Sequence, residues 1–501
     1  MNAEPRYRAV TDSISSGIEG LDDVLHGGLT PGRTYLVEGS PGSGKTTLAT
    51  QFLIEGLRHN EPCMFVTLSE SEEELHATAL SHDWSLAGLN FVELLPDETN
   101  LDPDTQYRMY HASEVELGET IKTVIDEAER VQPRRVVIDS VSELRLLAGN
   151  ALRYRRQIIA LKQFFARQAA TVLFTDDRTG DGGDAHLHSL AHGVISMERE
   201  VPPYGTTRRR LHVGKMRARS YREGLHDFMI RRGGLVVFPR LVAAEHRVSH
   251  ERETVKSGLD ALDLLLCGGL ARGTATLIMG AAGTGKSSLA AQFVQAAARR
   301  GDHCSMFIFD ESIATFLERS TGLGMEFAPL IDSGRVLLRQ VDPAELSPGE
   351  FAHSVREAVE QQHSRLIVID SLNGYLNAMP SETFLTLHLH ELLGYLGQRE
   401  VTSLLLMTQH GIVSSDANTP VDASYLADTV VLLRYFEVLG EIRQALSVIK
   451  KRTGNHERTI RELRFSKGIH VGEPLRNLHG VLTGTPHLVA NGEAQPQRVS
   501  L

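Results

Sequence analysis

Two short segments of the chain have the residue types and spacing of a phosphate-binding loop, G-x-x-x-x-G-K-[ST]. The first spans residues 39–46 and the second spans residues 280–287. In such a loop the glycines let backbone N–H groups surround phosphates, the lysine reaches the outer phosphates, and the last hydroxyl ligates Mg²⁺. Each loop follows an apolar strand pattern and precedes a helical pattern, so we predict two nucleotide sites. The residues expected to bind the nucleotide are Gly42, Ser43, Gly44, Lys45, Thr46 and Thr47 in the first loop and Gly283, Thr284, Gly285, Lys286, Ser287 and Ser288 in the second.

Carboxylates that could complete these sites recur at matching places in the two halves. Asp139 and Asp370 each end a short apolar run that is typical of a buried parallel strand. We predict that they hold Mg²⁺ together with Thr46 and Ser287. The alternative for both acids is an ordinary aspartate that caps the next turn.

A second pair of acids, Glu70 and Glu311, follows another strand-like run. A carboxylate at this place could polarise the attacking water or hydroxyl, so both are candidate catalytic residues. The alternative is an N-cap or first-turn acid of the following helix. Only the second half adds a further carboxylate, Asp310, where the first half has Ser69.

Basic residues end a late strand pattern in each half, as Lys215-Met216-Arg217 and Lys450-Lys451-Arg452. Positive groups favour phosphoryl transfer because they neutralise charge on the transferred group. A neighbouring subunit could supply them in trans. The alternative is a solvated basic strand end, but the recurrence at one spacing (452 − 217 = 235) favours the role in trans.

The two loops belong to a duplicated unit. Residues 17–22 match residues 258–263, and residues 47–52 match residues 288–293. All of these matches keep one offset, since 286 − 45 and 258 − 17 both equal 241. An offset this long indicates a duplicated domain rather than a short solenoid repeat.

Strand and helix patterns alternate within each half, which predicts an α/β fold with a mostly parallel sheet covered by helices on both faces. Later segments, residues 211–215 and 444–450, are expected to form an antiparallel extension. We predict domains at residues 1–245 and 246–486, followed by a flexible tail at 487–501.

The composition is that of an ordinary globular protein, with 41% hydrophobic and 23% charged residues among 501. A net charge of −11 argues against nucleic acid as the main partner. Cys63, Cys267 and Cys304 have no paired spacing, which favours reduced thiols. No run of 18 apolar residues and no apolar leader occurs, so we expect a cytoplasmic protein without a membrane anchor.

Paired units that each open G-[IL]-x-x-L-D-x-x-L-x-G-G-L before a phosphate-binding loop resemble the KaiC family of circadian-clock ATPases and autokinases. The resemblance runs from about Ser13 to Pro486. Residues 428–433, 437–441 and 451–456 resemble the second domain of that family beyond a generic RecA likeness. The resemblance implies two tandem RecA-like domains in a homohexamer, with ATP and Mg²⁺ at the subunit interfaces.

The family resemblance also implies an activity for each domain. The first would be a slow ATPase that supports assembly, and the second would transfer phosphate from ATP to hydroxyl groups of the protein and reverse that step, in timing or stress signalling. By position the acceptors are Ser424 and Tyr425, where the clock proteins have Ser-Thr, so Tyr425 is a departure. KaiB-like or other signalling proteins are the implied partners.

Further site residues come from the same resemblance. Ser81 and His456 match nucleotide-contacting residues, and Asp310 is the candidate Mg²⁺ ligand and general base toward Ser424. The family has paired glutamates where this chain has Ser69-Glu70, so hydrolysis in the first domain is expected to differ.

Two other functions remain open. A RecA- or RadA-like, DNA-dependent recombination ATPase would need basic loops, but residues 178–189 contain two aspartates and residues 411–424 contain no Lys or Arg. Such loops would bind a phosphate backbone poorly. The third function is a nucleotide-gated scaffold that binds partners without phosphotransfer, and the departure at Tyr425 keeps it open.

Overall fold

The computed structural model describes residues 12–94, 109–178, 185–242, 253–377, 384–409, 423–482 and 487–488. The chain divides into two compact units, Met1–Arg240 and Leu241–Leu501. Most of the segment that we expect to link the domains, and residues 489–501 of the predicted tail, lie outside the described residues. His487–Leu488 form a short strand, β22, which pairs with β21 (Leu478–His479).

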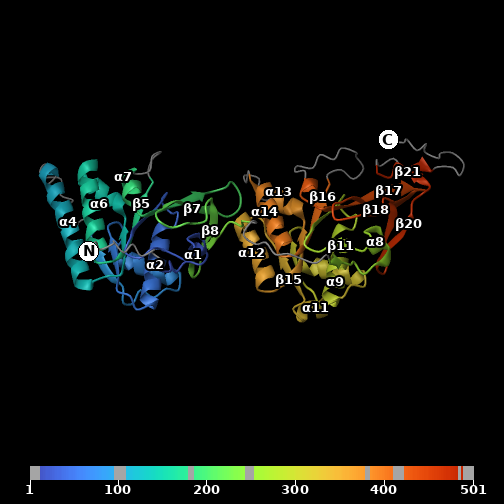
Figure 1. Ribbon diagram of the computed structural model, residues 1–501, viewed down its shortest axis with the longest axis horizontal. Helices are drawn as coiled ribbons and strands as arrows, with labels where there is room; N and C mark the ends of the chain where they lie inside the picture. Colours follow the sequence, from blue (N-terminus) through green and yellow to red (C-terminus); the bar gives the residue numbers. More distant parts are fainter. Residues whose placement is uncertain are drawn as a thin grey trace, which may run out of the picture. The chain divides into compact units, whose positions relative to one another are not determined.

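The first unit is built on a nine-stranded sheet in the order β3-β2-β4-β5-β1-β6-β7-β8-β9 (Figure 1). The strands from β3 to β6 run parallel, and the strands from β6 to β9 form an antiparallel meander. The elements are α1 (Leu21–Val24), β1 (Thr34–Gly39), α2 (Lys45–Arg58), β2 (Cys63–Thr67), α3 (Glu72–Ser81), β3 (Asn90–Glu93), α4 (Met109–Val131), β4 (Arg135–Asp139), α5 (Val141–Ala148), α6 (Ala151–Arg167), β5 (Thr171–Asp177), α7 (Ala185–Leu190), β6 (Gly193–Glu200), β7 (Arg208–Met216), β8 (His226–Arg231) and β9 (Gly234–Phe238).

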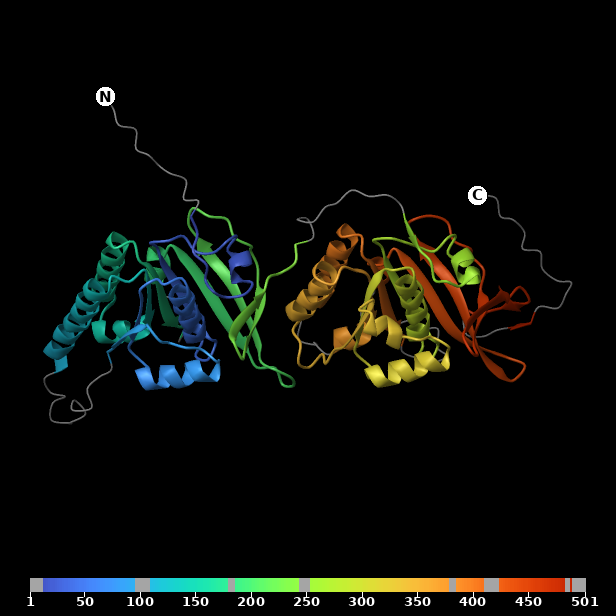
Figure 2. The ribbon, with the colours of Figure 1, turned by 90° about the horizontal axis from the view of Figure 1, so that it is seen from below.

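The second unit repeats this topology in the order β14-β13-β15-β16-β12-β17-β18-β19-β20. Figure 2 shows that each unit has helices packed beside a sheet in a similar arrangement. The repeated order extends the sequence duplication to the whole sheet and confirms the predicted fold class. The elements are β10 (Thr254–Val255), α8 (Asp260–Leu265), β11 (Leu270–Ala271), β12 (Ala275–Gly280), α9 (Lys286–Arg299), β13 (His303–Ile308), α10 (Ile313–Gly322), α11 (Ala328–Asp332), β14 (Val336–Gln340), α12 (Pro348–Glu360), β15 (Ser364–Asp370), α13 (Leu372–Asn377), α14 (Leu385–Gln398), β16 (Thr402–Thr408), the 3₁₀ helix η4 (Ala423–Tyr425), β17 (Thr429–Val438), β18 (Glu441–Lys451), β19 (Arg461–Phe465) and β20 (Ile469–Pro474).

Helices cover both faces of the first sheet because its central strands are apolar on both sides. In β1, Leu36 packs in one cluster with residues of α6 such as Leu161, and Val37 packs in the other with residues of α2 such as Phe52. All five residues of β4 are buried. The sequence of such a strand is a continuous apolar run and does not alternate between apolar and polar residues. Two clusters on the second sheet repeat this arrangement.

The two late strands are longer than the sequence pattern predicts. The strand expected at 211–215 spans Arg208–Met216, because β7 pairs with β6 along its whole length. The strand expected at 444–450 spans Glu441–Lys451, which pairs with β17.

Cys63 and Cys304 are buried, Cys267 is exposed, and all three thiols are free. Within the described residues, no helix is both long and apolar enough to cross a bilayer.

A buried histidine makes the first unit sensitive to acid. His226 is fully buried, receives a hydrogen bond at Nδ1 from the Arg240 amide and lies 3.0 Å through Nε2 from the Arg222 carbonyl. Burial lowers the pKa of His226 to about 4, below the value near 6.5 of an unfolded chain. As pH falls from about 6.5 to about 4, only the unfolded chain therefore takes up this proton, and the folded state loses about 3 kcal/mol of stability.

The resulting acid sensitivity can be measured through Trp84, because it is the single tryptophan of the chain and lies in the first unit. We expect urea midpoints from Trp84 fluorescence to fall steadily from pH 6.5 to pH 4. His226→Gln should remove part of that slope, and the exposed His59→Gln should not. An equal slope in all three proteins would contradict the assignment.

Candidate functional site

Both phosphate-binding loops connect a buried strand to a helix whose N-cap, a glycine, makes no side-chain capping hydrogen bond. Gly44 and Gly285 precede the helices with φ values of 105° and 94°, in the left-handed region that favours glycine. A Cβ on Gly44 would lie 2.6 Å from Ile230, and one on Gly285 would lie 2.0 Å from the ring of Phe465. Only glycine fits at these positions, and the helix N-termini can receive phosphate.

The two loop lysines are buried and turn back onto their own loops. Lys45 Nζ donates to the carbonyl groups of Gly39 and Ser40, each at 3.1 Å. Lys286 Nζ donates to the carbonyl groups of Gly280 and Ala281 at 3.0 and 2.9 Å. Burial lowers the pKa of Lys286, and the nearby Asp370 and Asp310 carboxylates oppose that change.

The predicted metal ligands of the first unit lie together. Thr46 Oγ1 donates to Asp139 Oδ2 at 2.7 Å, and Thr175 donates to the other oxygen of the same carboxylate. Burial raises the pKa of Asp139, and these two hydrogen bonds and Lys45 oppose the rise. Asp139 therefore faces the loop, and the N-cap of α5 is Ser140 rather than Asp139.

The second unit brings Ser287 and Asp370 together in the same way. Burial raises the pKa of Asp370 to about 6, against a hydrogen bond from Ser287 that lowers it. The Asp370 Oδ2 atom is buried and has no hydrogen-bond partner among the described residues. One carboxylate and one hydroxyl per site suit Mg²⁺ that is bound together with the phosphates of a nucleotide. The residues present therefore fit the ion.

The candidate catalytic acids lie beside these pairs. Burial raises the pKa of Glu70, and the charges of Asp139 and then Glu74 raise it further. Ser71 caps α3 with a capping box, so Glu70 is not the N-cap.

In the second unit two neighbouring acids have different partners. Asp310 accepts a hydrogen bond from Ser371, and Glu311 accepts one from Arg319 at 2.6 Å. Ser312 caps α10, so neither acid is its N-cap. Asp310 and Glu311 thus have separate environments although they are adjacent in sequence.

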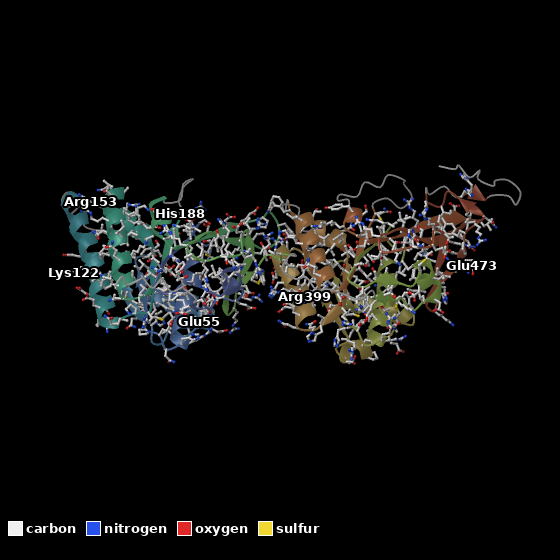
Figure 3. The ribbon with its side chains drawn as sticks, in the orientation of Figure 1. Glu55, Lys122, Arg153, His188, Arg399 and Glu473 are labelled. Atoms are coloured by element: carbon white, nitrogen blue, oxygen red, sulfur yellow. The ribbon has the colours of Figure 1, made fainter. Side chains whose placement is uncertain are left out.

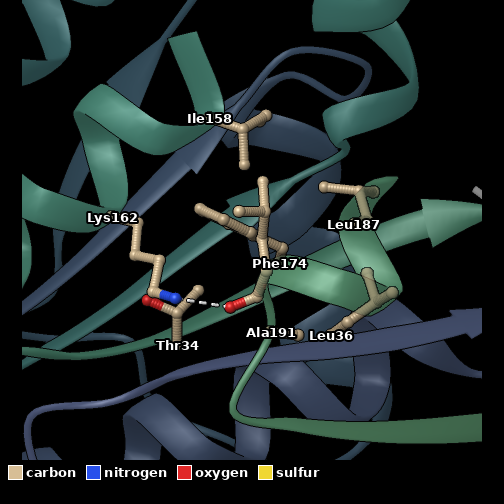
Figure 4. Close-up of a pocket in the computed structure, with 8 residues that line it drawn as sticks. Thr34, Leu36, Ile158, Lys162, Phe174, Leu187 and Ala191 are labelled. Carbon is tan, nitrogen blue, oxygen red and sulfur yellow. Dashed lines mark hydrogen bonds between the residues drawn. The ribbon is translucent and has the colours of Figure 1, made fainter. Parts of the chain in front are cut away.

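In the first unit, two residues of the basic triplet and Lys162 of α6 bind main-chain carbonyl groups shortly before β6. Lys215, Arg217 and Lys162 donate to the carbonyl groups of residues 188, 189 and 190 at the end of α7. His188 is labelled in Figure 3, and the bond from Lys162 is drawn in Figure 4. The cavity beside Lys162 holds only about 10 Å³ of space for a water-sized molecule, so it is too small for a nucleotide.

The matching residues of the second unit hold the turn that carries the expected acceptors. Lys450 Nζ donates to the carbonyl groups of Ser424 and Ala427 at 2.8 and 2.7 Å, and Arg452 donates to that of Tyr425 at 3.1 Å. The Tyr425 side chain is 52% exposed. Lys451 instead donates to carbonyl groups near α8.

Sheet register separates the triplets and the turn from the loops of the same unit. Lys450 pairs with Val430, and Val430 pairs with Leu277, three residues before Gly280. Lys215 occupies the same register in the first sheet, through Val194 and Leu36. Three residues of strand span about 10 Å. The triplets therefore lie toward the amino ends of the parallel strands, and the loops leave from the carboxyl ends.

Two predicted nucleotide contacts are not brought to a loop by any hydrogen bond described. Ser81 is exposed at the end of α3, where its hydroxyl donates to the Thr78 carbonyl at 2.7 Å. His456 is half-buried between β18 and β19. Both residues remain predictions.

Asp177, which belongs to no sequence motif named above, forms an ion pair with the lysine of the first loop. Its Oδ1 atom lies 2.6 Å from Lys45 Nζ. Asp177 pairs with Gly39 in the sheet, and the residue at the matching register of the second unit is Thr408. The Asp177 carboxylate thus occupies the lysine that the phosphates of a nucleotide would contact, and Thr408 at the matching register cannot form this ion pair.

We expect Asp177→Asn to tighten ATP binding at the first site about 3- to 10-fold, because the partly exposed ion pair no longer has to be broken. Titration with a fluorescent ATP analogue in a Lys286→Ala background isolates that site. Thr408→Asn in the second unit is the matched control and should leave first-site affinity unchanged. Weaker binding in Asp177→Asn would show that the carboxylate supports the nucleotide instead.

Comparison with known proteins shows which family has this sequence. A family model described as ATPase: KaiC matches residues 14–242 and 255–476. The circadian clock oscillator protein KaiC of Acaryochloris marina is 30% identical over 487 residues, which cover 96% of this chain and 92% of that protein. The proteins of the same name from Thermostichus vulcanus and Synechococcus elongatus are each 29% identical over 492 residues, 97% of this chain and 94% and 93% of theirs. The similarity covers both units and both loops.

Proposed function

Because the chain belongs to the KaiC family of ATPases, we propose that it forms a homohexameric ring with ATP bound between neighbouring copies. In this proposal the first unit hydrolyses ATP and supports assembly. The second unit transfers phosphate from ATP to Ser424 of a neighbouring copy and can reverse that step. The relatives are circadian clock proteins by name, which supports a role in timing rather than in DNA recombination. In this proposal the partners are other signalling proteins.

One observation supports transfer between copies: the expected acceptor and the phosphate-binding loop of one unit lie at opposite ends of the parallel strands. Ser424 lies in the turn before β17, and Lys450, which holds that turn, pairs with Val430 at the start of β17. Lys286 instead follows the end of β12, at the other end of the parallel strands. Reacting atoms must approach to about 3–3.5 Å. The loop of the same unit is farther from Ser424 than that, but a loop of a neighbouring copy has no such restriction.

The side chains supply the remaining chemistry. Mg²⁺, when bound with ATP, would neutralise phosphate charge beside Ser287 and Asp370. Asp310 accepts the proton of the Ser424 hydroxyl while the Ser424 oxygen bonds to the γ-phosphorus. The bond from that phosphorus to the bridging oxygen breaks, ADP leaves, and Lys286 balances the developing negative charge.

In the first unit the acceptor is water. Glu70 lies beside Asp139, and its pKa is raised by burial, as suits a group that accepts a proton from water. No second carboxylate precedes Glu70, since residue 69 is serine. The proposal therefore assigns hydrolysis to both units and protein phosphorylation to the second unit only.

Peptide mass spectrometry after incubation with Mg-ATP tests the proposed function. We expect one phosphate on Ser424, none in Ser424→Ala, and an unchanged amount in Tyr425→Phe. An unmodified protein that still hydrolyses ATP would leave the scaffold function, and phosphate on Tyr425 alone would reassign the acceptor.

A further inference from the structure

One guanidinium in the second unit joins the acid segment to the helix that follows the phosphate-binding loop. Arg319 on α10 donates through Nη2 to Glu311 Oε1 at 2.6 Å and through Nη1 to Ser288 Oγ at 2.8 Å. Glu311 follows β13, and Ser288 lies in the first turn of α9. We call these three side chains the brace. It ties the segment that carries Asp310 to the turn that carries Ser287.

Arg319 is itself held in place by the core. Its guanidinium carbon lies 5.4 Å from the ring centroid of Phe316, which is fully buried. The side chains of Arg319 and Glu311 are only 28% and 21% exposed. A guanidinium presents its donors in a rigid planar fork, so two simultaneous bonds fix the positions of both partners. The brace is therefore a geometric constraint more than a surface ion pair.

The described residues of the first unit form no such brace. Residues Glu70, Thr47 and Thr78 occupy the matching positions, because 311 − 70, 288 − 47 and 319 − 78 all equal 241. Threonine has no charge and is too short to bridge two partners. The arginine thus occurs in the unit in which an additional acid, Asp310, precedes the shared glutamate.

We propose that Arg319 is a positioning residue of the second site. By bridging Glu311 and Ser288 it sets the place of the Asp310 carboxylate relative to the phosphate-binding loop. This inference rests on the proposed phosphotransfer, and it deepens it by assigning Asp310 as the base and Glu311 as part of the brace. The guanidinium is engaged by the two partners, so its main effect falls on the rate of transfer rather than on ATP affinity.

Replacing Arg319 with threonine gives the second unit the residue of the first. We expect kcat for Ser424 phosphorylation to fall about 10- to 100-fold, as misplaced reacting groups do, while KM for ATP changes less than about 3-fold. Glu311→Gln should cause a similar loss, and the double variant should show little additional loss, because residues that act as one unit are not additive. Arg319→Lys keeps the charge and should recover part of the rate. Thr78→Ala is the matched control in the first unit and should change neither constant.

The results separate this inference from the proposed function. Losses that add in the double variant, an unchanged kcat in Arg319→Thr, or a change confined to KM would each overturn the brace. If Arg319→Thr lowers the melting temperature, the split between kcat and KM in Arg319→Lys decides instead. If the parent protein carries no phosphate on Ser424, the proposed function fails. The brace is then tested by kcat and KM for ATP hydrolysis at the second site. Glu70→Gln is included in every protein to suppress hydrolysis at the first site.

Discussion

Lys286→Ala is expected to lower phosphate incorporation at Ser424 by at least about 100-fold, since removal of one preorganised charge from a water-excluded site costs about 10²- to 10³-fold. Lys286 is the buried cation of the second loop, and its ammonium group is already directed at the loop carbonyl groups that border the phosphate site. Mass spectrometry after incubation with Mg-ATP measures the loss. Hydrolysis at the first site should persist.

A matched control for this change is Lys256→Ala, which removes an exposed lysine of the same unit. Its phosphorylation should equal that of the parent. Equal phosphorylation in Lys286→Ala and Lys256→Ala would remove the second loop from the mechanism.

Asp310→Asn is expected to slow the phosphorylation of Ser424 by about 10²- to 10⁴-fold, the usual contribution of a positioned general base. The amide cannot accept the serine proton, although it can still accept the hydrogen bond from Ser371. ATP affinity should change only by the small effect of removing one negative charge near the nucleotide. Quenched-flow sampling of phosphate on Ser424 under saturating ATP gives the rate.

Asp332→Asn, at an exposed position in the same unit, controls for the loss of a carboxylate. If Asp310→Asn keeps the parent rate and Glu311→Gln does not, the base is Glu311 and the two acids exchange roles.

Local motifs made much of each site predictable from the sequence. The loop glycines, Lys45 and Thr46 follow one another along the chain, so their contacts depend on one turn of backbone. Asp139 was predictable because parallel strands end at a common sheet edge, and Thr46 indeed bonds to it at 2.7 Å. The fold class followed from the alternation of strand and helix patterns within a duplicated unit.

Residues that act across the fold were not predictable in this way. Asp177 reaches Lys45 only because β5 lies beside β1 in the sheet, an order that the sequence does not state. Arg319 reaches Glu311 and Ser288 from a helix in which a single arginine gives no signal. The antiparallel strands β8 and β9 were also missed, since short half-buried strands carry weak periodicity.

Transfer between copies is the central claim, and mixing two inactive variants tests it most directly. Lys286→Ala copies retain Ser424 but cannot donate phosphate, and Ser424→Ala copies can donate but carry no acceptor. After subunits exchange in the presence of Mg-ATP, we expect phosphate on Ser424 of the Lys286→Ala copies, which isotope labelling distinguishes by mass. Mixed assemblies that contain both variants and still carry no phosphate on Ser424 would contradict transfer between copies.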